Sequence, residues 1–374
     1  MGIPRVGIEY TAAVQQGAGI GRYVRELVAA LFKLETRLDY RLFAASPAPL
    51  PALPFHVKRL PFHDRWLMRV WHRARIPFPV ELITGPIDLY HSPDFTLPPT
   101  RPRTRTLLTV HDLSFERDPD SADDHLRAFL SRVVPRSVAR ADHVLADSQA
   151  TKEDLIELWG TRADKVTVLY CGVDARFRPV TDAAALAAVR ARYGLGQGPF
   201  ILSVSTLQPR KNYRRLVQAF APLAARYPEL NLVIGGGKGW RYDEILAEPE
   251  RLGIGGRVLF PGFIAEDDLP ALYSAAEVMA YPSLYEGFGL PVLEAMACGT
   301  PVVASNRSSL PEVTADAGLQ VDPLDIDALT EGLAALVEDT ALRHDLATRG
   351  LAWARQFSWD RAARQLFSVY QHLL

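Results

Sequence analysis

The sequence predicts an α/β protein made of two doubly wound domains, each built on a parallel sheet. Short apolar runs of strand length alternate with segments of helical periodicity along the chain, which is typical of βαβ units. This rhythm restarts near the middle of the sequence. At 374 residues the chain is also too long for one hydrophobic core and predicts about two domains.

The first half contains six short runs that we expect to be strands, with helical stretches between most of them. They are Val6–Glu9, Tyr40–Ala44, Asp88–His91, Thr106–His111, Val144–Ala146 and Val166–Leu169. Inside this half, residues 56–76 carry six Lys or Arg against one acid, with Trp66, Leu67, Val70 and Trp71 at helical spacing. That pattern predicts a basic amphipathic helix, which could lie on an anionic membrane or pack its tryptophans inward.

The second half contains five further expected strands. They are Phe200–Val204, Leu232–Gly235, Val258–Phe260, Val278–Tyr281 and Val302–Ser305. A turn-rich stretch at 172–183 predicts the boundary between domains 1–178 and 179–355, where a hinge would create a cleft. The last segment, 356–374, has helical periodicity and an N-cap candidate at Ser358, so we expect a helix that could pack on either domain.

The strongest functional signal is the string EGFGLPVLEAMACGTPVV, which starts at Glu286 and follows an expected strand. The glycine-flanked loop Gly287-Phe288-Gly289 would let backbone N–H groups approach an anion, and Pro291 suits the first turn of a helix. Glu294 follows eight residues after Glu286. Two carboxylates beside a phosphate site suggest recognition of sugar hydroxyls.

Through this E-x7-E pattern the sequence resembles the retaining glycosyltransferases of family 4, over nearly its whole length. The resemblance implies the GT-B fold, in which two Rossmann-like domains face a central cleft. It also implies roles for individual residues. Glu286 would lie near the donor sugar, Glu294 would bind the nucleotide ribose, and the amides of Gly287, Phe288 and Gly289 would hold the diphosphate.

The string SVSTLQPRKN, at 203–212, directly follows the expected strand Phe200–Val204. A lysine in such a loop can neutralise a leaving diphosphate, so Lys211 is our first choice for this role. The segment is similar to the family's donor-phosphate motif, but Ser205 and Thr206 stand where the family commonly has an arginine. Whether Arg210 supplies the missing charge is left open.

His111 ends an expected strand, and the carboxyl edge of a parallel sheet is where open α/β folds bind ligands. The resemblance implies that His111 contacts the donor sugar near the reaction centre. The adjacent Asp112 could orient the imidazole ring or cap the turn.

The loop QQGAGIGRY contains Gly17, Gly19 and Gly21, but its distance from the first strand and Arg22 at the sixth position argue against a dinucleotide fingerprint. It resembles the family's G-G-I-G-R-Y loop, with Ala18 in place of the first glycine. By that resemblance Gly19 lines the donor-binding cleft.

Together with the resemblance, these features predict a retaining hexosyltransferase acting from a nucleotide diphosphate sugar on an acceptor hydroxyl in glycan, polysaccharide or glycolipid synthesis. The strings HDL at 111–113 and TLQPRKN at 206–212 resemble those of mannosyltransferase-like members of the family, and this resemblance favours GDP-mannose as the donor. UDP-glucose, UDP-N-acetylglucosamine and dTDP-rhamnose remain open as donors. No motif indicates a metal, and we expect no cofactor. Two alternatives stay in view: a glycoside phosphorylase of the same fold, and a nucleotide-sugar-binding protein without turnover.

The chain carries a net charge of −1, which gives no bulk attraction to nucleic acid. That total divides into +4 for residues 1–178 and −5 for the remainder. The donor would therefore be held by a few placed groups, and the basic first domain, where family acceptors mainly bind, hints at an anionic or lipid-linked acceptor. Because we find no signal peptide or apolar span, we expect a cytoplasmic protein, with peripheral membrane contact through 56–76.

Overall fold

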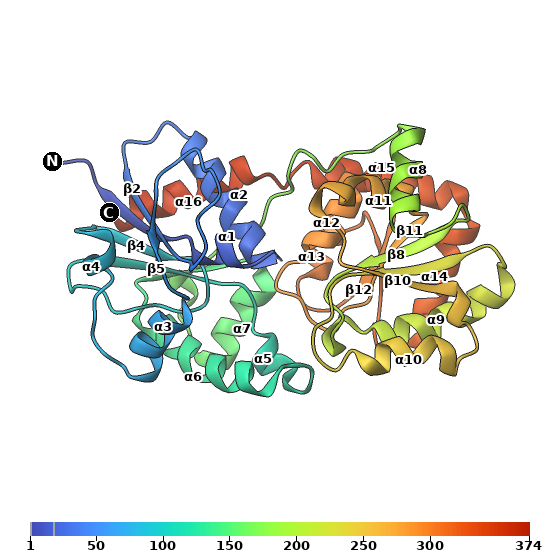
Figure 1. The fold of residues 1–374 in the computed structure, drawn as a ribbon, viewed down its shortest axis with the longest axis horizontal. Coiled ribbons are helices and arrows are strands. Elements are labelled where there is room, and N and C mark those ends of the chain that lie inside the picture. The colour runs from blue at the N-terminus through green and yellow to red at the C-terminus, as the bar shows by residue number, and fades with distance from the viewer. Residues whose placement is uncertain (1, 18) are drawn as a thin grey trace. The chain divides into compact units, whose positions relative to one another are not determined.

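The computed structural model describes residues 2–17 and 19–374, which form two compact units. The first unit comprises the chain up to Leu113 together with Asp124–Gly172 and Ser358–Leu374. The second comprises Ser114–Asp123 and Val173–Phe357. Each unit is a parallel sheet covered by helices (Figure 1).

The first unit holds a seven-stranded sheet in which all neighbouring strands are parallel. The strands are β1 (Arg5–Glu9), β2 (Asp39–Ala45), β3 (Val57–Leu60), β4 (Leu89–Ser92), β5 (Arg105–Val110), β6 (His143–Ala146) and β7 (Val166–Val168), in the spatial order β3-β2-β1-β4-β5-β6-β7. Its α-helices are α1 (Thr11–Gln15), α2 (Gly19–Lys33), α3 (Arg65–Met68), α4 (Glu81–Thr84), α6 (Asp124–Arg140), α7 (Gln149–Trp159) and α16 (Trp359–Leu373).

The second unit holds a six-stranded parallel sheet. The strands are β8 (Phe200–Val204), β9 (Asn231–Gly235), β10 (Val258–Gly262), β11 (Val278–Tyr281), β12 (Val302–Ser305) and β13 (Leu319–Val321), in the order β10-β9-β8-β11-β12-β13. Its α-helices are α5 (Ser114–Arg117), α8 (Ala183–Arg192), α9 (Tyr213–Arg226), α10 (Asp243–Arg251), α11 (Leu269–Ala275), α12 (Leu290–Ala297), α13 (Leu310–Thr314), α14 (Ile326–Glu338) and α15 (Thr340–Ala354).

Helix starts follow local capping chemistry. The side chain of Ser148 accepts a hydrogen bond from the Thr151 amide at the start of α7, and Ser358 does the same for the Arg361 amide at the start of α16. The N-cap and helix expected at Ser358 are therefore confirmed. Helix α16 lies in the first unit, where it packs against α2.

All eleven strands expected from the sequence are present, with ends that differ by at most two residues. The short strands β3 and β13 were not expected. The helix expected over 56–76 is wrong for its first part, because β3 pairs with β2 there, and only Arg65–Arg73 is helical, as α3 and a π-helical turn. Trp71 is buried in this turn and Trp66 is exposed.

Each sheet has one point where the strand order reverses. In the first unit it lies between β1 and β4, and in the second between β8 and β11. Open parallel sheets bind their ligands at the carboxyl ends of the strands that flank such a point. The loops after β8 and β11 are therefore the expected ligand-binding loops of the second unit.

Candidate functional site

Three of the predicted site residues meet in the second unit, on the loops that follow β8 and β11. Lys211 Nζ lies 2.5 Å from Glu286 Oε1, and Arg210 Nη1 lies 3.2 Å from Glu286 Oε2. Lys211 also donates a hydrogen bond to the Tyr281 hydroxyl at 3.0 Å. The carboxylate thus has one cation on each oxygen.

The charges of this cluster are set by its burial and its pairing. Burial alone would raise the pKa of Glu286, but the positive charges of Lys211 and Arg210 outweigh it and lower the pKa to about 2. A hydrogen bond from Ser283 acts in the same direction. Glu286 is therefore ionised at neutral pH, and the three side chains together carry one excess positive charge.

The loop Gly287–Gly289 is buried and leads directly into α12. Gly289 is the N-cap, with φ of 116°, and Pro291 occupies the first turn as expected. The Ser309 hydroxyl lies within hydrogen-bond distance of the carbonyl oxygens of Glu286 and Phe288, at 2.9 Å and 2.7 Å, and its one hydrogen can be shared between them. The loop after β12 thereby fixes the loop that the sequence predicted to hold a phosphate.

Glu294 is buried on α12, where its carboxylate accepts a hydrogen bond from the Tyr273 hydroxyl at 3.1 Å. Tyr273 belongs to α11, so this contact ties two helices of the second unit together. The assignment of Glu294 to the ribose stays a prediction.

The first unit holds the other two predicted residues, His111 and Gly19. His111 follows β5 and is buried, with Nδ1 at 2.7 Å from Asp147 Oδ2 and Nε2 at 2.8 Å from the Pro93 carbonyl oxygen. Asp147, which follows β6, therefore orients the imidazole. The sequence had offered the adjacent Asp112 for this role.

Gly19 is the first residue of α2 and is exposed, and an added Cβ would have no neighbour within 4 Å. The sterically constrained residue of this loop is Gly21, because a Cβ there would lie 1.8 Å from the Gln16 carbonyl oxygen. Ala18, the departure from the family's loop, lies outside the described residues.

Sequence reasoning missed several residues that shape the site. They are Asp147 at His111, Tyr281 and Ser283 at Glu286, and Ser309 at the phosphate loop. Each of these residues lies at the end of an expected strand or in the loop that follows one. That placement was a usable signal for Asp147 in particular.

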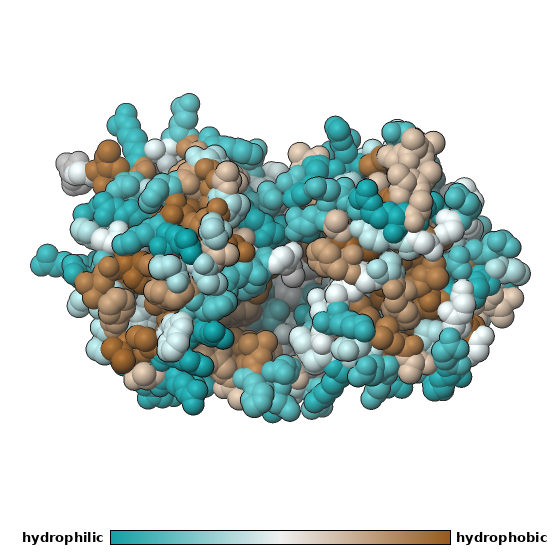
Figure 2. Space-filling model, in the orientation of Figure 1, coloured by the Kyte–Doolittle hydropathy of each residue, from teal (hydrophilic) through white to brown (hydrophobic). Residues whose placement is uncertain are grey.

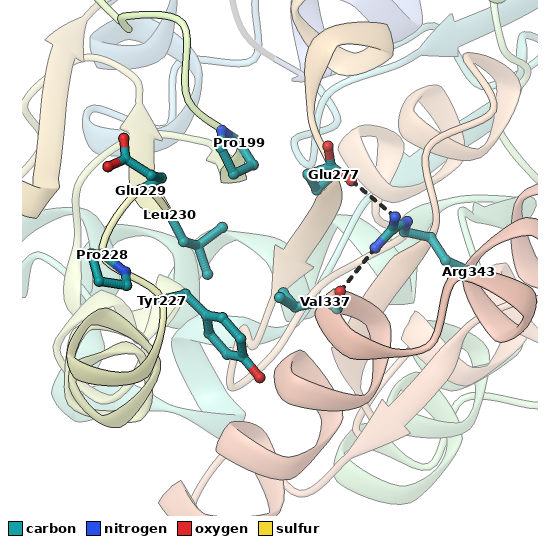
Figure 3. A pocket seen from close by; sticks show the side chains of 8 residues that line it. All are labelled: Pro199, Tyr227, Pro228, Glu229, Leu230, Glu277, Val337 and Arg343. Atoms are coloured by element: carbon teal, nitrogen blue, oxygen red, sulfur yellow. Dashed lines mark hydrogen bonds and ion pairs between the residues drawn. The ribbon is translucent and has the colours of Figure 1, made fainter.

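A pocket of about 410 Å³ opens elsewhere in the second unit (Figure 3). It lies at the amino edge of the sheet, lined by residues that directly precede β8, β9 and β11, namely Pro199, Leu230 and Glu277. Arg343 reaches Glu277 at 3.4 Å there. None of the predicted site residues lines this pocket, so it is separate from the loops described above.

Two sequence families cover most of the chain. Residues 17–177 match the family described as Glycosyltransferase Family 4, and residues 188–353 match Glycosyl transferases group 1. O-antigen chain mannosyltransferase B of Escherichia coli is 36% identical over 289 residues, which cover 76% of this chain and 74% of that protein. The serotype-specific mannosyltransferase WbdA of the same organism is 30% identical over 76% of this chain, but this match covers only 36% of WbdA.

Solved structures share the fold over the whole length. Sucrose-phosphate synthase of Thermosynechococcus elongatus superposes with a TM-score of 0.77 at 24% identity and covers 99% of both chains. Anabaena Alr3699/HepE, solved with UDP and glucose, has a TM-score of 0.77 at 21% identity and covers 99% of this chain and 100% of its own. The chain therefore belongs to glycosyltransferase family 4, in its mannosyltransferase-like group, and has the GT-B fold.

Proposed function

We propose that this glycosyltransferase moves a hexose, with mannose favoured, from a nucleotide diphosphate sugar to an acceptor hydroxyl in glycan, polysaccharide or glycolipid synthesis. The observation that carries the proposal is the cluster of Lys211, Arg210 and Glu286 beside the loop that starts α12. Cations next to backbone amides at a helix start suit a diphosphate.

In this proposal the donor rearranges the ion pairs of the cluster. Its diphosphate competes with Glu286 for Lys211 and Arg210, which frees carboxylate oxygens to accept hydrogen bonds from the sugar. The bond between the anomeric carbon and the diphosphate breaks, the acceptor oxygen bonds to that carbon, and the acceptor's hydroxyl proton passes to the leaving phosphate. Charge develops on the diphosphate as its bond breaks, and the two cations then stabilise the transition state more than the ground state. Arg210 would thus supply the charge that the family commonly takes from an arginine at the position of Ser205 or Thr206.

The favoured donor is GDP-mannose, a choice supported by the mannosyltransferase names of two relatives. The test is a thermal-shift screen of the whole chain with GDP, UDP and dTDP, followed by transfer assays with their sugars. We expect GDP to raise Tm most and GDP-mannose to be turned over. A larger rise in Tm with UDP or dTDP, with turnover of the corresponding sugar, would show that the hexose is not mannose. No change in Tm with any of the three nucleotides would overturn the proposed function.

We further propose that transfer retains the anomeric configuration and needs no metal ion. Support comes from Lys211 and Arg210, which can take the place of a divalent cation at the diphosphate. Transfer should proceed at an unchanged rate in EDTA, and the product should keep the donor's anomeric configuration by NMR. A rate that returns only on adding Mg²⁺ or Mn²⁺, or an inverted product, would contradict this part.

A peripheral contact with the inner face of the cytoplasmic membrane is also proposed, through the segment 56–76. Arg65, Arg69 and Arg73 are exposed there, and Trp66 is 53% exposed beside Arg69. Hydrophobic residues also gather on the surface near α3 and α4 in Figure 2, where Leu82 is 56% exposed. No helix within residues 2–17 and 19–374 combines the length and apolar character needed to cross a bilayer.

The membrane contact is tested by sedimentation with anionic liposomes. The wild-type chain should pellet with the vesicles, and the triple variant with Glu at 65, 69 and 73 should stay in the supernatant, because the reversed charges are repelled by anionic lipid. A variant with Glu at the exposed Arg162, Arg355 and Arg364 controls for the change in total charge. Equal partitioning of all three proteins would contradict a membrane role for this segment.

A further inference from the structure

Two buried histidines, one on β4 and one directly after the neighbouring β5, have different hydrogen-bond partners. His91, on β4, contacts the Tyr370 hydroxyl at 2.8 Å through Nδ1 and the Thr109 hydroxyl at 3.0 Å through Nε2. A hydroxyl can donate or accept a hydrogen bond. A neutral imidazole with one N–H and one lone pair therefore satisfies both partners of His91.

His111, which follows β5, faces partners of another kind. Its Nδ1 lies 2.7 Å from a carboxylate oxygen of Asp147, and its Nε2 lies 2.8 Å from the backbone carbonyl oxygen of Pro93. An ionised carboxylate and a carbonyl can only accept hydrogen bonds. Both ring nitrogens must then carry a proton, and only the imidazolium form satisfies both contacts.

The surrounding charges agree with this geometry. Burial alone would lower the pKa of His111, but the charge of Asp147, its hydrogen bond and the charge of Asp94 raise it to about 9. For His91, burial and the positive charge of His111 lower the pKa to about 3. The groups that face His111 are Asp147 and Asp94, the neighbouring His91, and the rings of Tyr23 and Phe95 in edge contact.

We propose that His111 serves as a fixed cation that stays protonated at neutral pH, that Asp147 is the positioning residue that keeps it so, and that His111 is not a proton acceptor in the reaction. The role of this cation in the reaction rests on the proposed hexosyl transfer, whereas the protonation of His111 does not. The pair also joins the ends of three adjacent strands, because Pro93 follows β4, His111 follows β5 and Asp147 follows β6. Within the described residues, Asp147 Oδ1 has no hydrogen-bond partner, so His111 is the group that Asp147 holds by a direct contact.

The first test needs no activity. In the full-length wild-type chain with ¹⁵N-labelled histidine, both ring nitrogens of His111 should show imidazolium shifts at pH 7 and should titrate only near pH 9, while His91 stays neutral from pH 6 to 10. His111→Gln and His91→Gln assign the two signals. A neutral His111 ring at pH 7 would overturn the proposal.

The second test uses Asp147→Asn, which keeps an acceptor oxygen for Nδ1–H and removes the negative charge. His111 should then lose its proton near neutral pH, and kcat should fall at least tenfold at pH 7.5 and recover as the pH is lowered to 5.5. Asp147→Glu, which keeps the charge, should retain most of the activity. A purely structural contact would give a loss that does not depend on pH.

Tyr370→Phe provides the matched control, because it removes a hydrogen bond from the neutral histidine instead. It should lower Tm without changing the pH profile of kcat. An Asp147→Asn variant with an unshifted His111 titration and an unchanged pH profile would refute the role of Asp147. If the wild-type chain transfers no hexose while its His111 ring is imidazolium, the proposed function fails and the charge assignment stands.

Discussion

At the scale of single residues, Glu286 is a buried carboxylate that stays ionised only because cations lie against both of its oxygens. Lys211 and Arg210 supply these contacts, and Ser283 adds a hydrogen bond. Removing a charge from such a group leaves its partners buried without a counter-charge. A substitution at Glu286 should therefore affect both stability and donor turnover.

Glu286→Gln should lower kcat by about 10²–10³-fold, which is typical for the loss of one placed group that stabilises transition-state charge or holds the substrate. The measurement is steady-state transfer with the donor identified by the nucleotide screen. Glu248→Gln is a matched control, since Glu248 is a buried carboxylate paired with Arg251 on α10 of the same unit. Equal loss of kcat in both variants would show that the effect is one of folding.

Glu9, at the end of β1, is a buried carboxylate. Burial and the charge of Asp94 raise its pKa from 4.5 to about 7, although Tyr90 donates a hydrogen bond to it at 3.2 Å. A raised folded-state pKa means that the folded chain holds this proton more tightly than the unfolded chain. The stabilisation by this group is complete below pH 4.5 and is lost as the pH rises through 7.

Glu9→Gln should therefore make the chain more stable than the wild type at pH 8. The expected gain is about 3 kcal/mol, because each unit of difference between the folded and unfolded pKa corresponds to about 1.4 kcal/mol. At pH 4.5 the two proteins should unfold alike. Urea unfolding at both pH values measures the difference. A constant offset between the variants across this range would contradict the prediction.

At the scale of elements, the loop that begins α12 was predictable because its signals are contiguous in the chain. The glycines, Pro291 and the following apolar helix together encode a strand, a tight loop and a helix start. The partners that hold this loop come from elsewhere: Ser309 follows β12 and Lys211 follows β8. Such pairings depend on strand order, which a single sequence does not specify.

The same limit explains the outcome at His111 and in segment 56–76. Asp147 lies 36 residues from His111 and becomes its partner only because β5 and β6 are neighbours. Strand β3 has the sequence VKRL, whose basic residues fit a short, partly exposed edge strand as well as a helix. Periodicity over so few residues cannot separate the two.

Gly289→Ala should destabilise the second unit by about 1–3 kcal/mol and weaken donor binding, because the residue has φ of 116° and a Cβ would lie 2.7 Å from Leu310 Cδ2. Urea unfolding and a GDP or UDP titration measure the two effects. Gly256→Ala is the control, since a Cβ there meets no atom within 4 Å. If the Gly289→Ala and Gly256→Ala variants were equally stable, the predicted strain at Gly289 would be contradicted.

At the scale of the whole molecule, the first unit is assembled from both ends of the described chain. Helix α16 packs on α2, and its Tyr370 reaches the ring of His91 on β4. Buried Trp359, Leu366 and Tyr370 form the apolar face of α16. The helix is thus part of the hydrophobic core of the first unit.

A chain that stops after Phe357 should lose the cooperative unfolding of the first unit, while the second unit, which ends at Phe357, keeps its own transition. Tyr370→Phe, a milder change, should cost about 1 kcal/mol through its lost hydrogen bond to His91. Calorimetry resolves both effects. Two undiminished transitions in the shortened chain would show that α16 is dispensable.

The placement of α16 also dictates an order of events during synthesis. The second unit can fold once Phe357 has left the ribosome, but the unit whose first strand is made earliest must wait for Ser358–Leu374. At roughly 5–20 residues per second, translating the intervening segment takes roughly ten to forty seconds. Throughout that interval the apolar side of α2 has no covering helix, so the nascent chain offers chaperones a binding surface that the finished protein lacks.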